Sequence, residues 1–156
     1  YLIEQIQENR GEIHKNISLR FNHPVKELVF VATSSSPPGG TLKLKLNGHD
    51  RFETRDLTYF TRQQVYDYHT GYGGLGSEGG GVGVRSSGSG VDTIAVYSFA
   101  LKPEEHQPSG TCNFSRIDNS QLKCISGTVN SNSTIYAVNY NVLRIMSGMG
   151  GLAYSN

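Results

Sequence analysis

The most chemically suggestive residues of the sequence are Glu104, Glu105 and His106, which stand between Pro103 and Pro108. Two carboxylates beside an imidazole can bind a metal ion or exchange protons with a substrate. On adjacent loop positions, however, the three side chains point apart. A His-x-His pair, which would let two imidazoles converge on a metal from one strand, is also missing from the sequence. We therefore expect a structural role for the triplet, with no catalytic residue, metal ligand or cofactor site.

A second polar group is formed by His49, Asp50 and Arg51, directly after Asn47-Gly48. A hydrolytic His/Asp pair needs a nucleophile that is held by the base. The sequence has many serines but no Gly-x-Ser-x-Gly nucleophile elbow. We expect a polar turn in which Arg51 takes part in an ion pair.

Glycine fills half of the positions from 71 to 90, and GYGGLG at its start matches the pattern G-x-G-x-x-G. A dinucleotide site would need a strand before this pattern and a helix after it. Neither is indicated, and a segment so rich in glycine matches the pattern by chance. We expect residues 71–90 to form a long, mobile surface loop.

Charge and hydropathy exclude several classes of function. The 14 basic and 13 acidic residues give a formal net charge of +1, which argues against a nucleic-acid partner. No apolar run reaches the roughly 18 residues of a membrane span, and no signal peptide is present. The chain starts at Tyr1, within a segment that reads as a strand, and we interpret it as a piece of a longer protein.

Two cysteines and three glycosylation patterns leave alternatives open. Cys112 and Cys124 could form one disulfide, but buried thiols in a reducing compartment are the favoured interpretation. Asn16, Asn113 and Asn132 each begin an Asn-x-Ser/Thr pattern. This pattern is short and frequent, and the sequence does not decide whether any of the three is used.

Most of the remaining sequence predicts short strands. Leu42, Leu44 and Leu46 alternate with lysines, which is the period of a half-buried strand, and Asn47-Gly48 predicts a tight turn after it. Alternation and apolar runs together predict about eight strands. They cover residues 2–7, 17–21, 28–32, 42–46, 96–101, 112–117, 122–125 and 134–145. In the last of these, the Tyr136 and Val138 side chains share one face, and Asn139 lies on the other.

One short helix is expected in a connecting loop. Asp56 would cap it, and Leu57, Phe60 and Tyr68 fall on roughly one face of a helix that runs to Tyr66. Strands and helices do not alternate, which favours antiparallel sheets. We predict a single all-β domain over residues 1–156, an eight-stranded antiparallel jelly-roll sandwich.

The segment from Tyr97 to Asp118 reads as a strand, a sharp corner and a second strand. Pro103 and Pro108 cannot donate a backbone hydrogen bond, and Gly110 tolerates a positive φ. These three residues therefore predict a fixed corner between two core strands.

Four stretches resemble the major capsid protein of nucleocytoplasmic large DNA viruses, closest to the algal-virus and giant-virus branch. They are FNHPVKELV at 21–29, LNGHDRF at 46–52, PEEHQPSGTCNFSR at 103–116 and NVLRIMSGMGGL at 141–152. The resemblance runs along nearly the whole chain except the glycine-rich segment, and it points to the C-terminal jelly roll of that family.

The resemblance implies a structural protein of an icosahedral capsid rather than an enzyme. Such proteins carry two jelly rolls in one chain, and three chains form a trimeric, pseudo-hexagonal capsomer in a shell over an internal membrane. The implied location is the virion, assembled in the host cell. The implied partners are the other chains of a homotrimer, neighbouring capsomers and minor capsid proteins, without nucleic acid and without a direct membrane span.

Two segments are candidates for contacts between subunits, because neither is needed for a closed core. They are the corner at residues 103–110 and the C-terminal residues 146–154. Two other functions stay open. A carbohydrate-binding jelly-roll module would use a tyrosine-lined groove, and a cupin-like metalloenzyme would need the metal ligands that the sequence lacks.

Overall fold

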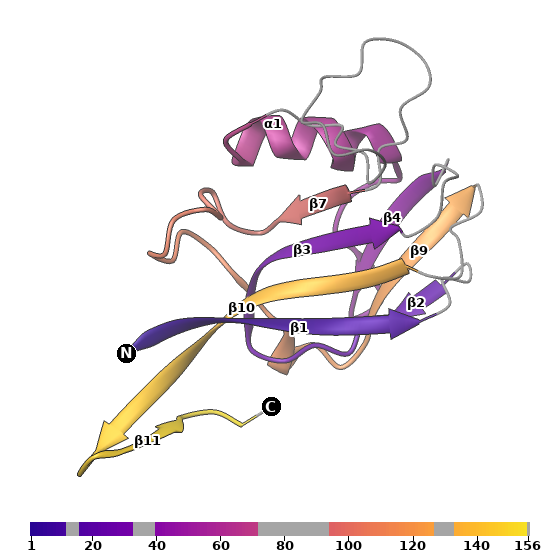
Figure 1. Ribbon diagram of the computed structural model, residues 1–156. Helices are drawn as coiled ribbons and strands as arrows, with labels where there is room; N and C mark the ends of the chain where they lie inside the picture. The colour runs from indigo at the N-terminus through magenta and orange to yellow at the C-terminus, as the bar shows by residue number, and fades with distance from the viewer. Residues whose placement is uncertain (12–15, 33–39, 72–93, 127–132, 156) are drawn as a thin grey trace.

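The computed structural model describes residues 1–11, 16–32, 40–71, 94–126 and 133–155, and these form two antiparallel sheets that face each other (Figure 1). The first sheet has the order β1-β10-β3-β7. Its strands are β1 (Leu2–Gly11), β10 (Ser133–Met146), β3 (Pro24–Ala32) and β7 (Ile94–Ser98), and β8 (Cys112–Asn113) and β11 (Met149–Leu152) extend it. The predicted all-β antiparallel sandwich is confirmed.

The second sheet has the order β2-β9-β4-β5, and β6 also pairs with β4. Its strands are β2 (Asn16–Ser18), β9 (Ser120–Ser126), β4 (Thr41–Leu46), β5 (His49–Asp50) and β6 (Arg55–Asp56). The predicted strands near 17, 42–46 and 122–125 all lie in this sheet. The described strands outnumber the predicted eight because several of them are only two to four residues long.

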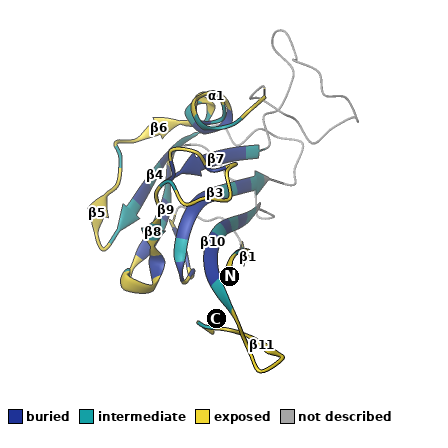
Figure 2. Ribbon diagram, turned by 90° about the vertical axis from the view of Figure 1, so that its left-hand side faces the viewer, coloured by how far each residue is buried: buried dark blue, intermediate teal, exposed yellow. Residues whose placement is uncertain are grey.

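The core lies between the two sheets, where the inward-facing residues are buried (Figure 2). β3 and β10 contribute Leu28, Phe30 and Ile135, while β4 contributes Leu42 and Leu44. These residues alternate along each strand with less buried ones, so the period-2 pattern of the sequence does mark the core side.

The tight turn at Asn47-Gly48 is confirmed as the β4–β5 hairpin. Both residues have positive φ, 51° and 81°, the backbone that a two-residue hairpin requires. Asn47 Oδ1 accepts hydrogen bonds from the backbone N–H groups of Asp118 and Asn119, at 3.0 and 3.2 Å. The hairpin turn is thereby tied to the chain just before β9.

The helical segment consists of η1 (Tyr59–Gln63) and α1 (Gln64–Tyr68). Asp56, the predicted cap, ends β6, where it pairs with Thr41, and it directly precedes Leu57, the first residue with helical backbone. Thr58, the residue before η1, makes no side-chain capping hydrogen bond. Phe60, predicted on the inner face, is fully buried. Burial of this ring therefore holds the segment in place.

Two further predictions are wrong in their extent. The first strand, predicted over residues 2–7, is longer, because β1 stays paired with β10 up to Gly11 and Ser133. The strand expected at 112–117 is only β8, followed by the 3₁₀ turn η2 (Phe114–Arg116). Asn113 causes this change, because its side chain accepts a hydrogen bond from the Ser115 N–H and so caps the turn.

Along β10 the alternation is confirmed, and the structure shows which side faces the core. Ile135 and Ala137 are core residues, and Asn139 on the same side is fully buried. Tyr136 and Val138 lie on the other side, facing outward. β10 therefore carries apolar side chains on its outer face as well as in the core.

Candidate functional site

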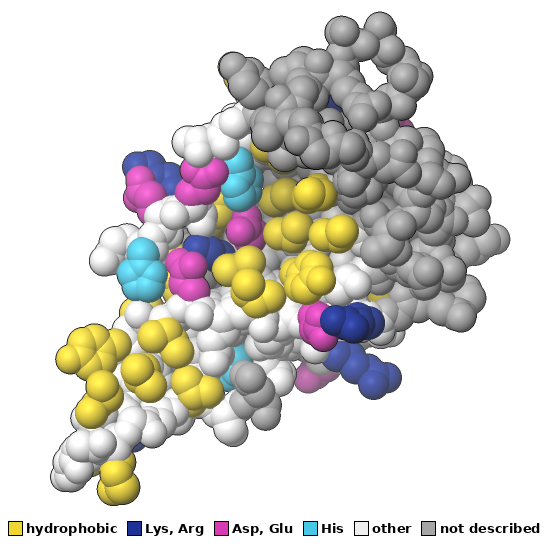
Figure 3. Space-filling model, viewed as in Figure 1, with side chains coloured by type: hydrophobic (Ala, Val, Ile, Leu, Met, Phe, Trp, Pro, Cys, Tyr) yellow, Lys and Arg dark blue, Asp and Glu magenta, His cyan; other side chains and the backbone are white. Residues whose placement is uncertain are grey.

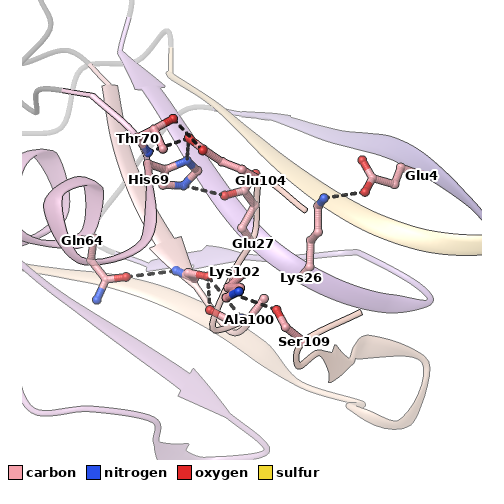
Figure 4. A network of polar contacts seen from close by, with 11 residues as sticks. Glu4, Lys26, Glu27, Gln64, His69, Thr70, Ala100, Lys102, Glu104 and Ser109 are labelled. Atoms are coloured by element: carbon pink, nitrogen blue, oxygen red, sulfur yellow. Dashed lines mark hydrogen bonds and ion pairs between the residues drawn. The ribbon is translucent and has the colours of Figure 1, made fainter. Parts of the chain in front are cut away.

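The three residues of the triplet at 104–106 lie in the irregular corner between β7 and β8, and they do not converge. Glu105 pairs with the Lys102 Nζ at 3.1 Å, and His106 Nδ1 lies 3.5 Å from Glu4 Oε1. Glu104 instead turns toward His69 and Thr70 (Figure 4). Within the described residues, no group of three or more His, Cys, Asp and Glu side chains could hold a metal ion.

The corner is closed by its own hydrogen bonds. The Lys102 N–H donates to Ser109 Oγ at 2.8 Å, and Ser98 Oγ donates to the Ala100 carbonyl at 2.7 Å (Figure 4). Gly110 follows with a φ of 144°, a region that favours glycine. These features agree with the predicted fixed corner.

A polar cluster that the sequence analysis missed lies beside the corner. His69, just after α1, stands between Glu27 of β3 and Glu104 of the corner (Figure 4). Its Nε2 is 2.9 Å from Glu27 Oε2, and its Nδ1 is 3.3 Å from Glu104 Oε1. Both are ion-pair distances, and neither Glu27 Oε2 nor His69 Nε2 has a hydrogen-bond partner of good geometry among the described residues. A carboxylate on each side of the ring favours its protonated form.

The carboxylates on either side of His69 favour its charged form. The Glu27 carboxylate beside Nε2 is the main cause that raises the pKa of His69, against the opposing effect of burial. Hydrogen bonds from the side chain and backbone of Thr70 are the main causes that lower the pKa of Glu104, and His69 adds to them. We call these four residues, Glu27, His69, Thr70 and Glu104, the His69 clasp. It connects the end of α1 to β3 and to the corner.

The His69 clasp predicts a pH-dependent contribution to stability. The folded-state pKa of His69 is raised above 6.5, so the contribution is fully present below that pH and is lost as the pH rises through the raised value. We expect His69→Gln to lower the free energy of unfolding by about 1 kcal/mol near pH 5.5 and by clearly less near pH 9. Urea unfolding of both proteins across this pH range measures the difference.

His106→Gln is the matched control for this prediction, because the His106 side chain is 58% exposed and only 3.5 Å from its nearest carboxylate oxygen. It should change the unfolding free energy little at either pH. A His69→Gln effect that stays constant from acid to alkaline pH would show that the ring is not protonated in the folded protein.

The polar group at 49–51 forms a turn, as predicted, but with a different ion pair. In the described part of the chain, Asp50 forms ion pairs with Lys43 and Lys45 and none with Arg51. The hydrogen bond from Lys43 is the main cause that lowers the pKa of Asp50. No nucleophile takes part in this arrangement, which is a surface ion-pair group.

The remaining sequence-predicted sites are placed as follows. Cys112 is half-buried and Cys124 buried, both are thiols rather than a disulfide, and burial raises the pKa of each. Asn16 begins β2, and Asn113 caps η2. Asn132, and all of the glycine-rich segment beyond Gly71, lie outside the described residues.

An open pocket of about 590 Å³ beside η1 is lined in part by Tyr59 and Tyr66. Sugar-binding grooves present a free aromatic face, and here the Arg55 guanidinium lies 5.3 Å from the centre of the Tyr59 ring. Arg55 therefore covers one face of the Tyr59 ring, whereas Tyr66 is 82% exposed.

The C-terminal segment forms a projecting hairpin, and we call residues 143–152 the terminal hairpin. Leu143–Met146 pairs with β11 as far as Leu152, through a turn at Ser147-Gly148. It extends beyond the sandwich (Figure 1). Its large apolar side chains are exposed: Ile145, Met146, Met149 and Leu152. Exposed apolar side chains on a projecting element are typical of a contact surface.

Comparison with known proteins identifies relatives for nearly the whole chain. Residues 38–151 match the family model described as large eukaryotic DNA virus major capsid protein. The chain is 45% identical over 174 residues to the major capsid protein of Pyramimonas orientalis virus, covering 100% of this chain and 43% of that protein. It is 35% identical over 229 residues to that of Paramecium bursaria Chlorella virus 1, covering 100% and 48%.

The fold of this chain is similar to that of solved capsid proteins. A chain in the quasi-atomic model of the PBCV-1 virus capsid superposes with a TM-score of 0.78 at 33% identity, covering 100% of this chain and 51% of that chain. The Faustovirus major capsid protein superposes with a TM-score of 0.54 at 13% identity, which shows a shared fold alone. The chain thus spans about half the length of these two major capsid proteins and of the PBCV-1 capsid chain.

Proposed function

The chain belongs to the large eukaryotic DNA virus major capsid protein family, and we propose that it is one of two jelly rolls in a capsid chain that assembles as a trimer. Its expected function is structural, as a building block of an icosahedral shell, and its location is the virion. Residues 1–156 would be the C-terminal jelly roll. Three complete chains would then form a pseudo-hexagonal capsomer.

One observation supports this proposal above the others. The whole chain superposes on 51% of a capsid chain, with a TM-score of 0.78. All of this chain matches about half of the capsid chain. We expect that ratio if the capsid chain contains two sandwiches of this size. The fold prediction of a jelly roll is confirmed by the same superposition.

The proposal includes no catalysis and no cofactor. The supporting observation is that Glu104, Glu105 and His106 each contact a different partner, so the corner has no convergent set of reactive groups. The proposed partners are protein surfaces: other copies of the chain, neighbouring capsomers and minor capsid proteins. Among the described helices, none has the length and apolar character of a membrane span.

Contacts between subunits are proposed at the two segments indicated by the sequence. The corner at 103–110 is closed by the Lys102–Ser109 hydrogen bond and exposed from Glu104 to Pro108, with Leu101 beside it 74% exposed. The terminal hairpin projects from the sandwich with Met149 75% exposed. Interfaces that assemble capsids must bury large and partly apolar surfaces, and such side chains supply them.

Deletion of residues 148–156 from the full-length protein tests the proposal. We expect the truncated protein to fold, because residues 148–155 hydrogen-bond to the C-terminal part of β10, from Asn141 onward, and contribute no residue to the core cluster. We expect it to form few or no trimers. Native mass spectrometry measures the oligomeric state, and circular dichroism checks the fold. A matched control, Ile125→Ser together with Tyr66→Ser, removes exposed apolar side chains elsewhere and should leave the trimer intact. Normal trimers of the truncated protein would rule out the terminal hairpin as a subunit contact.

A further inference from the structure

The tip of the corner, residues 104–108, is exposed and is attached to the rest of the described chain mainly through Glu104. Its two carboxylate oxygens accept hydrogen bonds from the N–H and the hydroxyl group of Thr70, at 2.8 and 2.7 Å. His69 Nδ1 lies 3.3 Å from the same carboxylate, whereas His106 reaches a carboxylate of β1 only at 3.5 Å. Charged and histidine side chains gather on the side of the molecule where the corner lies (Figure 3).

The corner and α1, which this contact joins, each have a separate attachment to the sandwich. The corner is closed by its own hydrogen bonds, and at its base the Phe99 N–H donates to the Lys26 carbonyl of β3 at 2.9 Å. α1 is attached to β7, because Gln64 Oε1 accepts a hydrogen bond from the Ser98 N–H at 3.1 Å. Loss of the contact between the tip and the end of α1 would therefore free the tip without unfolding either element.

The two carboxylates that face the His69 ring differ in exposure. Glu27 Oε2 and His69 Nε2 are both shielded from solvent. The Glu27 side chain is 11% exposed, and that of Glu104 is 40% exposed. β7, which also packs on α1, carries no charged residue. The other charged groups of the packed elements have partners of their own in the described chain: Lys26 with Glu4, Asp67 with Gln63, Lys102 with Glu105 and His106 with Glu4.

Loss of the ring proton removes the positive charge that both carboxylates share, and it leaves one ring nitrogen without an N–H. A neutral ring then no longer balances two carboxylates, one on each side. Glu27 is the costlier carboxylate to leave unpaired, because it is the more buried. Glu104 can instead turn into solvent, where water hydrates its charge. The contact between the ring and the corner is therefore the one that breaks.

We propose that His69 is a proton-operated latch: its protonated ring holds the tip of the corner against the end of α1, and loss of the proton frees the tip. The Glu27 carboxylate, and with it Glu104, raises the pKa of His69 above 6.5. The latch is closed below the raised value and opens as the pH rises through it. Because the corner is one of the two segments proposed as subunit contacts, the latch makes that contact sensitive to pH, a consequence that rests on the proposed function.

Hydrogen–deuterium exchange of the full-length protein tests the latch at the Thr70 amide. This N–H donates to Glu104 in the closed state, and Thr70 is exposed, so the protection of its amide reports the contact directly. Mass spectrometry with fragmentation to single residues measures the exchange rate, which is divided by the intrinsic rate at each pH. We expect the protection of the Thr70 amide to fall severalfold between about pH 6 and about pH 9, while that of β4 in the core stays unchanged.

Two replacements of His69 are expected to fix the latch in opposite states. His69→Gln removes the ring charge, so the protection of the Thr70 amide should be low at both pH values. His69→Lys keeps a positive charge throughout this pH range, so the protection should stay high at both. His106→Gln is the matched control, because the His106 side chain is 58% exposed, and it should keep the pH dependence of the unchanged protein.

Equal protection of the Thr70 amide at both pH values in the unchanged protein would overturn the latch, whether or not the variants fold. An equal fall in the protection of β4 would also overturn it, because the whole domain would then be unfolding. Loss of the pH dependence in His106→Gln would assign the effect to the wrong histidine and have the same consequence. Every contact of the latch lies within one chain, so a failed latch with normal trimers leaves the proposed function standing.

Discussion

Replacement of Phe60 by alanine will lower the free energy of unfolding by about 3–5 kcal/mol. Phe60 is fully buried, and its ring contacts four others, with centroid distances of 6.4 Å to Phe30, 5.5 Å to Phe52, 5.1 Å to Tyr59 and 6.4 Å to Tyr97. These rings come from β3, β7 and the loop after β5 as well as from η1. Truncation therefore leaves a cavity where the two sheets and the helical segment meet.

The control for this prediction lies on the same helical segment. Tyr66 is 82% exposed, and Tyr66→Ala should change the unfolding free energy by less than about 0.5 kcal/mol. Urea unfolding followed by circular dichroism gives both values. Equal effects of the two replacements would show that the aromatic cluster around Phe60 is not part of the stable core.

Gly110→Ala is expected to destabilise the corner by about 1–3 kcal/mol. Gly110 has a φ of 144°, and a Cβ built there would lie 2.8 Å from the Phe99 carbonyl oxygen. That oxygen belongs to the backbone just after β7, so it cannot move aside as a flexible side chain could. The strain therefore has to shift the corner itself, which also holds Glu104 of the His69 clasp.

Gly150→Ala is the matched control for the corner replacement. A Cβ at Gly150 meets no atom within 4 Å, and its φ lies outside the positive region. The unfolding free energies of both variants and of the unchanged protein can be compared in one urea series. If Gly110→Ala is as stable as Gly150→Ala, the corner is not rigid and its proposed role as a fixed contact surface fails.

The strands were predictable where one physical signal was strong. The leucines and lysines of β4 and the Asn47-Gly48 turn have the required spacing and backbone preference, and the structure confirms both. The prediction of a strand over 112–117 was wrong in its extent. Apolar residues alternate there as in a strand, but alternation does not show that the Asn113 side chain accepts a hydrogen bond from the Ser115 N–H and starts a 3₁₀ turn.

Periodicity reveals which residues share a face, but it does not say which face meets the core. On β10 the side with Tyr136 and Val138 looked at least as apolar as the side with Asn139, yet Asn139 is the buried one. A strand that is apolar on both sides usually lies between two layers. The sequence of β10 was ambiguous because this strand carries apolar side chains on its outer face as well as on its core face.

The His69 clasp could not be predicted from the sequence. Glu27, His69 and Glu104 are far apart along the chain, and only the pairing of β3 with β7 and the closure of the corner bring them together. The triplet at 104–106 attracted attention because its residues are adjacent in sequence. In the structure its members separate, and only Glu104 enters a cluster.

The native mass of the full-length protein tests the central claim most directly. The account predicts that a chain of roughly twice this length, purified without denaturant and measured by native mass spectrometry, is a trimer. A protein that stays monomeric at the concentrations used for assembly would contradict the proposal that this jelly roll is a building block of a trimeric capsomer.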